Sequence, residues 1–262
     1  MLQGHFIQAR SGQLFVTQFG QASVDNRILF LPSLFEEMNL SRAIVAKQAQ
    51  YLALYGYAVY CLDYFGTGDS EGDLAETNAE TMIKDVCDTV GWLADNGARQ
   101  ISLWGLRMGG MIGLAGCQDV KAILPVSKIV LWKPVTNARQ FMTQFLRLKQ
   151  ASMMMQGAPK RDWRQEILNG ELVEVAGYPL TATLLSSIDS MVFPLTNQSL
   201  PKVVWMEVAS TSILPAISLA TSDWNQDKLV LRHFPGTAFW QVPELFQQAH
   251  LHQPMLALLE EP

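Results

Sequence analysis

Short apolar runs and helical stripes alternate along most of this chain. Apolar runs of strand length occupy residues 27–31, 57–62, 100–104, 129–132, 203–208 and 228–234. Between several of these runs, apolar residues recur at helical spacing, as in residues 42–55 and 77–95. Buried strands that alternate with helices predict an α/β fold with a mostly parallel sheet flanked by helices. Two earlier strands, at residues 6–9 and 14–19, predict an opening hairpin.

Residues 133–200 interrupt this alternation. They contain a basic, methionine-rich helical pattern at residues 141–155, and prolines break the remainder. No internal repeat or low-complexity linker separates this stretch from its neighbours. We therefore expect a single domain of residues 1–262 with a cap inserted at about residues 133–200. A closing helix is expected at about residues 243–250.

Charge and composition narrow the classes of partner. The chain has 262 residues, 49% of them hydrophobic, which suits one large α/β domain. Its net charge of −5 argues against a general nucleic-acid binder. Residues 128–164, however, hold eight basic residues against one acidic residue. We therefore expect an anionic ligand, or contact of the cap with a membrane surface, with Arg147 and Lys149 as candidate contacts.

The cysteines and the amino terminus bear on location. Three cysteines lie far apart in apolar segments, without the spacing of a disulfide framework or a metal site. The first residues lack the basic and apolar regions of a secretory signal, and no apolar stretch reaches the roughly 20 residues of a membrane span. We expect a cytoplasmic protein with reduced cysteines and with neither a metal nor a cofactor. The oligomeric state is left open.

A glycine-flanked turn after residues 100–104 carries the first family resemblance. Together with the order of elements, the turn Gly105–Leu106–Arg107–Met108–Gly109 resembles the α/β-hydrolase superfamily over nearly the whole chain. In that family a G-x-S-x-G turn lifts a nucleophilic serine above the sheet. Here Arg107 takes the place of the serine. A guanidinium stays protonated near neutral pH and has no lone pair with which to attack an acyl carbon.

The other two members of a serine triad are also missing from their expected places. Residues 209–215, where the acid should follow its strand, contain no carboxylate, and Glu207 lies within the strand. The place of the histidine falls on Ala238 or Phe239. His233 lies about five residues earlier, and we expect it to be structural. The remaining histidines are expected at the surface: His5, His250 and His252. Three absent roles argue against ordinary acyl transfer.

Four segments are more distinctive than the general fold. They are residues 31–42, 104–109, 131–135 and 140–148. These segments resemble the exosortase A system-associated hydrolases, in the form with arginine at the elbow and Phe-Trp after the last strand. The resemblance implies a bacterial gene cluster for exopolysaccharide production and protein sorting, and a hydrolase name. It implies no substrate.

In the α/β-hydrolase architecture the loop at residues 32–39 faces the elbow. Glu36 or Glu37 is therefore a candidate partner for Arg107 in a two-forked ion pair. Alternatively, the two glutamates only begin the next helix, where its dipole favours them, and Arg107 points to solvent. Asp63 and the glycine turn that follows it are expected to maintain shape rather than to catalyse.

Three functions remain open on the sequence. The first is a hydrolase-fold protein without triad chemistry that binds an anionic or glycan-linked ligand. The second is an active hydrolase of an ester or lipid-linked intermediate, with Arg107 as electrophile and a substitute constellation drawn from Asp63, Ser210, Thr211 or His233. The third is a peripheral-membrane or scaffold protein that uses residues 141–155. The candidate ligand-binding residues are Arg107, Met108, Ser33, Leu34, Glu36, Glu37 and Trp240.

Overall fold

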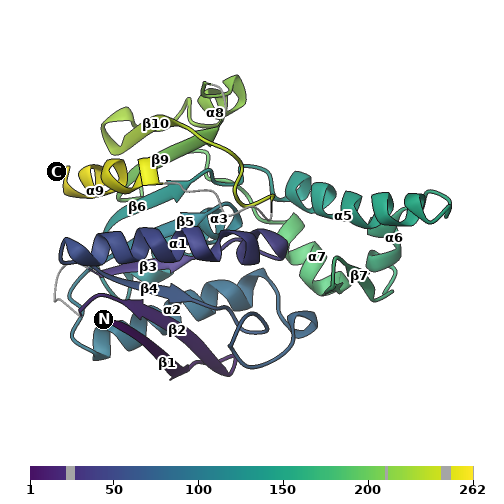
Figure 1. Ribbon diagram of the computed structural model, residues 1–262, viewed down its shortest axis with the longest axis horizontal. Coiled ribbons are helices and arrows are strands. Elements are labelled where there is room, and N and C mark those ends of the chain that lie inside the picture. Colours follow the sequence, from purple (N-terminus) through teal and green to yellow (C-terminus); the bar gives the residue numbers. More distant parts are fainter. Residues whose placement is uncertain (22–26, 210–211, 243–248, 262) are drawn as a thin grey trace.

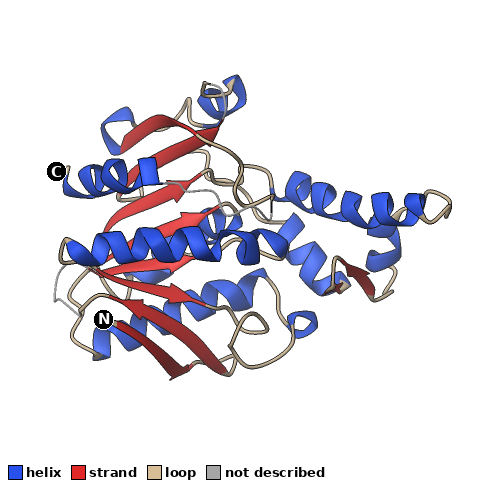
Figure 2. Cartoon of the chain, in the orientation of Figure 1, coloured by secondary structure: helices blue, strands red, loops and turns tan. Residues whose placement is uncertain are grey.

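The computed structural model describes residues 1–21, 27–209, 212–242 and 249–261. Its core is an eight-stranded sheet in the order β1-β2-β4-β3-β5-β6-β9-β10, drawn in red in Figure 2. The hairpin strands β1 and β2 are antiparallel to their neighbours, and the other strands pair in parallel. The strands are β1 (Leu2–Gln8), β2 (Gln13–Phe19), β3 (Arg27–Leu31), β4 (Ala58–Leu62), β5 (Ile101–Leu106), β6 (Val126–Trp132), β9 (Lys202–Ala209) and β10 (Leu229–Pro235). The predicted α/β-hydrolase architecture is confirmed.

Helices cover both faces of the sheet, because successive strand residues point to opposite sides. In β3, Leu29 and Leu31 join one core, whereas Ile28 and Phe30 join the other. The first core is covered by α2 and α3, and the second by α1 and α9 (Figure 1). The covering helices are α1 (Glu36–Leu54), α2 (Ala79–Asp95), α3 (Met108–Ala115), α4 (Cys117–Lys121), α8 (Pro215–Ala220) and α9 (His252–Glu260). Short 3-10 turns occur at Leu74–Glu76, Gln226–Lys228 and Ala249–Leu251.

The chain between β6 and β9 builds a separate group of elements, which we call the α5–α7 segment. It comprises α5 (Ala138–Met155), α6 (Trp163–Leu168), β7 (Val173–Val175), β8 (Tyr178–Leu180) and α7 (Ala182–Asp189). In Figure 1 it extends to the right of the sheet, beyond the ends at which the parallel strands finish. The α5–α7 segment thus lies on the side of the sheet where the elbow turn is formed.

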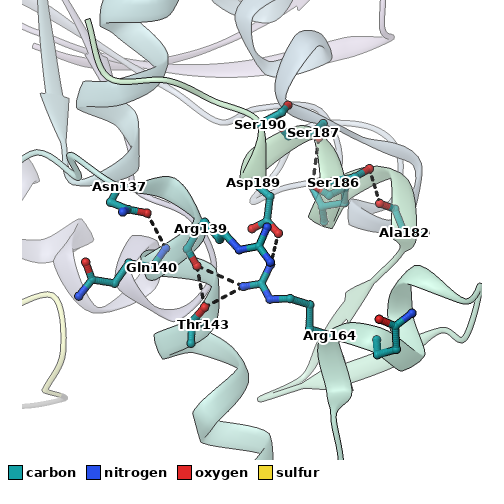
Figure 3. A network of polar contacts seen from close by, with 12 residues as sticks. Asn137, Arg139, Gln140, Thr143, Arg164, Ala182, Ser186, Ser187, Asp189 and Ser190 are labelled. Atoms are coloured by element: carbon teal, nitrogen blue, oxygen red, sulfur yellow. Dashed lines mark hydrogen bonds and ion pairs between the residues drawn. The ribbon is translucent and has the colours of Figure 1, made fainter. Parts of the chain in front are cut away.

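Polar contacts hold the α5–α7 segment together and attach it to the main body. Arg164 of α6 forms an ion pair with Asp189 of α7, and it donates hydrogen bonds to the Arg139 carbonyl oxygen and to Thr143 Oγ1 of α5 (Figure 3). Ser187 Oγ of α7 accepts a hydrogen bond from the backbone of Ala79 at the start of α2, at 3.0 Å. The segment is therefore fixed to the main body.

Helix boundaries differ from the sequence prediction at two places. Helix α1 begins at Glu36, not near residue 42, so the second half of the expected loop at residues 32–39 is helix. Acidic residues in a first turn are favoured by the helix dipole, which explains this earlier start. Helix α2 is capped by Asn78 and begins at Ala79, two residues after the start of the pattern at residues 77–95. Most of the helix expected at residues 243–250 lies outside the described residues, and the described chain closes with α9.

The sequence predicts surface positions for three histidines, and the structure places only one of them, His250, at an exposed position. His5 is half-buried and bonds to Gln18, and His252 stacks on Tyr51, so both have packing roles. His250 is exposed. No helix among the described residues is long and apolar enough to cross a membrane.

Candidate functional site

Arg107 occupies the tight strand-to-helix turn that the sequence predicts. It lies between β5 and α3 with φ 53° and ψ −117°, a conformation that residues with a side chain rarely adopt. The flanking glycines are required by space. A Cβ atom on Gly105 would lie 2.4 Å from Gly110 Cα, and one on Gly109 would lie 2.0 Å from the carbonyl oxygen of Leu31. The shape of a nucleophile elbow is thus preserved around an arginine.

The guanidinium of Arg107 is held by Glu37, from the first turn of α1. Arg107 Nε lies 3.2 Å from both carboxylate oxygens of Glu37, and Nη2 lies 3.1 Å from Oε1. Ser33 Oγ donates to Glu37 Oε2 at 2.6 Å, which fixes the carboxylate from behind. Both charged side chains are mostly buried, with exposed fractions of 11% for Arg107 and 14% for Glu37. The expected ion pair therefore forms with Glu37, whereas Glu36 is exposed.

A second ion pair lies beside the first and was not predicted from the sequence. Lys133, directly after β6, pairs through Nζ with Glu207 of β9. The Glu207 carboxylate is fully buried and also accepts a hydrogen bond from Trp205 Nε1 at 3.0 Å. Arg107 Nη1 approaches the carbonyl oxygen of Lys133 at 3.4 Å, so the two pairs adjoin. The sequence did contain a sign of this pair. Glu207 lies inside an apolar strand, and a buried charge needs a partner of opposite charge.

Backbone strain is concentrated around these two ion pairs. Among the described residues, four that are not glycine have positive φ, and three of them follow strands at this end of the sheet. Phe35 follows β3 with φ 60°, Arg107 follows β5 with φ 53°, and Lys133 follows β6 with φ 46°. Such conformations are retained at sites that the surrounding structure holds in shape.

A cleft of about 690 Å³ opens above Arg107, between the strand ends and α5. Its charged lining is Arg107, Lys133 and Glu207. Its uncharged polar lining consists of amide and hydroxyl side chains: Thr136, Asn137, Gln140, Gln144, Thr237 and Gln241. Trp240 forms one wall, and its ring centroid lies 5.3 Å from Arg107 Cζ. Because each cation of the floor has a carboxylate partner, the cleft presents hydrogen-bonding groups without a surplus of positive charge.

A smaller groove of about 190 Å³ lies next to the cleft. Apolar side chains dominate its lining: Leu34, Phe35, Leu40, Phe141, Phe145, Leu148 and Trp240. Glu36 and Glu37 also line it. Of the other candidate ligand-binding residues, Ser33 is buried behind Glu37, and Met108 is buried in the core and lines neither the cleft nor the groove.

Comparison with known proteins fits this geometry. A family model described as serine aminopeptidase, S33, matches residues 34–174, which is more than half of the chain. The chain belongs to this S33 hydrolase family. The match includes the Arg107 turn, α1 and α5, so the family region contains the Arg107 part of the cleft floor and the α5 wall, whereas Glu207 lies beyond it. A search of curated proteins found no significant match.

Solved structures confirm the fold of this S33-family chain. A putative hydrolase from Agrobacterium vitis is 17% identical, with a TM-score of 0.67 over 99% of this chain and 100% of that one. An esterase from Exiguobacterium antarcticum is 16% identical, with a TM-score of 0.65 over the same shares of the two chains. The mouse α/β-hydrolase domain-containing protein 10 is 19% identical, with a TM-score of 0.60 over 99% of this chain and 97% of that one. At such identities the likeness establishes the fold alone.

Asp63 and His233, the two described residues of the proposed substitute constellation, do not line the cleft of the S33-family chain. Asp63 forms an ion pair with Arg42 at 2.8 Å, and its other oxygen accepts a hydrogen bond from the backbone of Asp69. Burial raises the pKa of the Asp63 carboxyl, and Arg42 opposes this shift. A Cβ atom on Gly68 would lie 2.0 Å from Asp63 Oδ2, so this carboxylate shapes the turn.

His233, Ser210 and Thr211 are the other residues considered for a substitute constellation. His233 lies within β10, and its Nε2 is 3.1 Å from the carbonyl oxygen of Ala209. Neither His233 nor Asp63 lines the cleft. Ser210 and Thr211 lie outside the described residues.

Acidic residues offset much of the positive charge of residues 128–164 in the structure. Arg164 pairs with Asp189, and Arg161 pairs with Glu166. Residues 165–200 add four acidic residues and no basic residue, which offsets much of the charge. Arg147 is exposed, and Lys149 Nζ lies 5.7 Å from the centroid of Trp163. Within the described part of the chain, neither Arg147 nor Lys149 forms an ion pair.

Proposed function

We propose that this S33-family protein is a ligand-binding pseudoenzyme, in which a glycan-linked ligand occupies the cleft above Arg107. The observation that carries the proposal is the Arg107–Glu37 ion pair at the place of the nucleophile. Two-forked bonding and burial keep the guanidinium in a fixed orientation. The arginine is therefore part of a built floor and not a loose surface residue.

The rest of the cleft supports binding without triad turnover. Ala238 lines the cleft where the sequence register puts the histidine, and Phe239 is buried in the core. Among the described residues, neither a serine nor a histidine lines this cleft. Acyl transfer through a serine needs a nucleophile and a base that contact each other.

The polar lining favours an uncharged glycan over an anion. Both cations of the floor already have carboxylate partners, so an anion would compete with Glu37 or Glu207. The amide and hydroxyl side chains of the cleft can donate to and accept from hydroxyl groups.

The exosortase-associated subfamily is the second part of the proposal. The four segments that carry the sequence resemblance contribute Leu34, Arg107, Lys133 and Phe141 to the cleft or to the groove. The distinctive sequence is thus concentrated around one site. A gene neighbourhood without exosortase or exopolysaccharide genes contradicts this part.

A membrane role through the apolar face of α5 is not favoured. Phe141 and Phe145 are buried, and Phe145 stacks on Phe35 with ring centroids 4.2 Å apart. The Phe141 and Phe145 side chains therefore pack against the main body and are not available for insertion into lipid.

The test combines activity-based labelling with ligand binding. The purified protein should remain unlabelled by a fluorophosphonate probe and should not hydrolyse short acyl esters, because loss of a triad reduces turnover about a millionfold. Arg107→Ser should also remain inactive, since the cleft lining contains no histidine in the part of the chain that the structure describes. Saturation-transfer NMR with a panel of neutral and phosphorylated saccharides should detect binding that Gln140→Ala weakens.

Esterase activity in the wild type would contradict the pseudoenzyme proposal and support the alternative of an active hydrolase with a substitute constellation. Binding of no saccharide would contradict the glycan part.

A further inference from the structure

Resting on the proposed ligand-binding function, we infer that the site takes an amphipathic ligand, whose uncharged hydroxyl-bearing head lies in the cleft and whose single hydrocarbon chain lies in the groove. The argument rests on two adjoining cavities of opposite character. Their sizes, linings and shared border determine which part of a ligand each can hold.

The cleft is suited to the head. Its rim carries four amide side chains, contributed by Asn137, Gln140, Gln144 and Gln241. Amides offer both donors and acceptors, as a head with several hydroxyl groups requires. The paired charges of the floor add polarity without favouring either sign of net charge.

The groove is suited to the chain. Phe141, Gln144, Phe145 and Leu148 follow one another at helical spacing and present a single face of α5 to it. Opposite this face lie Leu34 and other apolar residues from the start of α1. A dry cavity of about 150 Å³ accommodates a benzene molecule, so a groove of about 190 Å³ accommodates a short hydrocarbon segment.

The two cavities share one border. Phe141, Gln144, Trp240 and Gln241 line both the cleft and the groove. Trp240 lies at this border with its ring near the Arg107 guanidinium. A ligand that crosses the border would pass from amides and hydroxyls to aromatic and aliphatic side chains within one site.

The carboxylates of the groove select against an anionic head. Glu36 and Glu37 line the groove, and Glu36 forms no ion pair among the described residues. A fatty-acid carboxylate near this border would be repelled. An uncharged head has no such penalty.

The walls of the groove are already assembled. Phe35 stacks on Phe145 at 4.2 Å, and Asn39 Nδ2 donates to the Tyr178 hydroxyl at 2.8 Å, which joins α1 to β8. The Arg164 contacts to α5 and α7 fix the first turns of α5, at Arg139 and Thr143 (Figure 3). A preformed groove binds a chain without first having to order its own walls.

The experiment is a calorimetric titration of the full chain with alkyl β-glucosides of one, four, six, eight and ten carbons, each below its micelle concentration. Each methylene that enters the groove should tighten binding about fourfold, which corresponds to about 0.8 kcal/mol. The gain should stop once the groove is full. Octyl glucoside should bind more tightly than octanoate, which has a charged head.

Two matched variants assign the two parts of the ligand. Leu148→Asp should reduce the gain per methylene to less than about twofold and leave methyl glucoside binding unchanged. Leu168→Asp is its control, because Leu168 is 44% exposed against 45% for Leu148 and lines neither cavity. Gln140→Ala should weaken every member of the series by a similar factor. Gln156 is exposed at the end of α5, and Gln156→Ala should leave the binding of the series unchanged.

The outcomes separate this inference from the proposed function. Binding of methyl glucoside with no dependence on chain length overturns the amphipathic ligand but leaves the glycan-binding function standing. Tighter binding of octanoate than of octyl glucoside overturns the uncharged head. Binding of no member of the series overturns the inference, and the saccharide panel then decides the proposed function separately.

Discussion

Lys133 and Glu207 form an ion pair at the floor of the cleft, and the Glu207 carboxylate has no exposure to solvent. Lys133 therefore neutralises a charge that would otherwise be buried alone. A buried ion pair contributes little net stability, but removal of one partner leaves an uncompensated charge. This asymmetry gives a direct test of the pair.

Lys133→Met should reduce the free energy of unfolding by about 3–5 kcal/mol, because Glu207 is left buried without its partner. The double variant Lys133→Met with Glu207→Leu should recover most of that loss. Urea unfolding of the wild type, both single variants and the double variant measures the coupling. Additive effects of the two substitutions would show that the pair does not exist in solution.

The strained conformation of Arg107 predicts an unusual order of stability. The free energy of unfolding of Arg107→Gly should exceed that of Arg107→Ala by about 1–2 kcal/mol, because only glycine adopts this φ without strain. At Gln50, an exposed position of α1, Gln50→Ala should instead be more stable than Gln50→Gly, by about 1 kcal/mol. Urea denaturation of the four variants provides the measurement. The same order at both positions would contradict the strained turn.

The buried carboxyl of Asp85 predicts a stability difference that depends on pH. Asp85 accepts hydrogen bonds from Ser11 Oγ and from the backbone of Phe65, and burial raises its pKa, helped by Asp88 and opposed by Arg10. A raised folded-state pKa means that the folded protein gains stability as the pH falls through that pKa toward the unfolded value.

The wild type should therefore gain stability relative to Asp85→Asn when the pH is lowered from 7 toward the ordinary pKa of aspartate, roughly 4. Urea unfolding of both proteins at several pH values measures this difference. If the wild type instead loses stability relative to Asp85→Asn as the pH falls, then the hydrogen bonds, and not burial, determine the direction of the Asp85 pKa shift.

The unpaired cations of α5 predict how an anionic partner would bind. If Arg147 and Lys149 form the contact, Arg147→Glu with Lys149→Glu should abolish binding to anionic vesicles, and wild-type binding should weaken as salt rises. Lys47→Glu with Arg99→Glu changes the net charge equally at exposed positions of the main body and serves as control. Vesicle sedimentation measures the binding. Equal losses in both double variants would indicate a response to net charge alone.

The periodic parts of the sequence were sufficient to predict the fold. The strand at residues 27–31 and the helix at α2 follow directly from apolar spacing, and the glycines around Arg107 specify the elbow by excluding any Cβ. The start of α1 was harder to place. Glu36 and Glu37 resemble loop residues by polarity, and the effect of the helix dipole on them is too weak to locate a boundary.

The candidate site was predictable only in part. Its shape follows from the elbow, and the architecture offered Glu36 or Glu37 as a partner for Arg107, of which the structure shows Glu37. The Lys133–Glu207 pair could not be assigned, because the partners are 74 residues apart and meet only through the β6–β9 pairing. The neutralised charge of the α5–α7 segment was also hidden, because Asp189 lies outside the stretch that drew attention for its basic residues.

The strained turns at Phe35, Arg107 and Lys133 have a consequence for how this chain tolerates mutation. Each such turn costs about 1–3 kcal/mol, against a net stability of roughly 5–15 kcal/mol for a typical domain. Trp104 and Trp132 pack together at 4.7 Å within the strands that lead into two of these turns. A substitution in this buried layer removes packing that opposes the strain, so the cleft should relax before the domain unfolds. Genetic drift in the interior of the sheet would therefore appear first as a loss of ligand binding, long before it appears as a loss of folded protein.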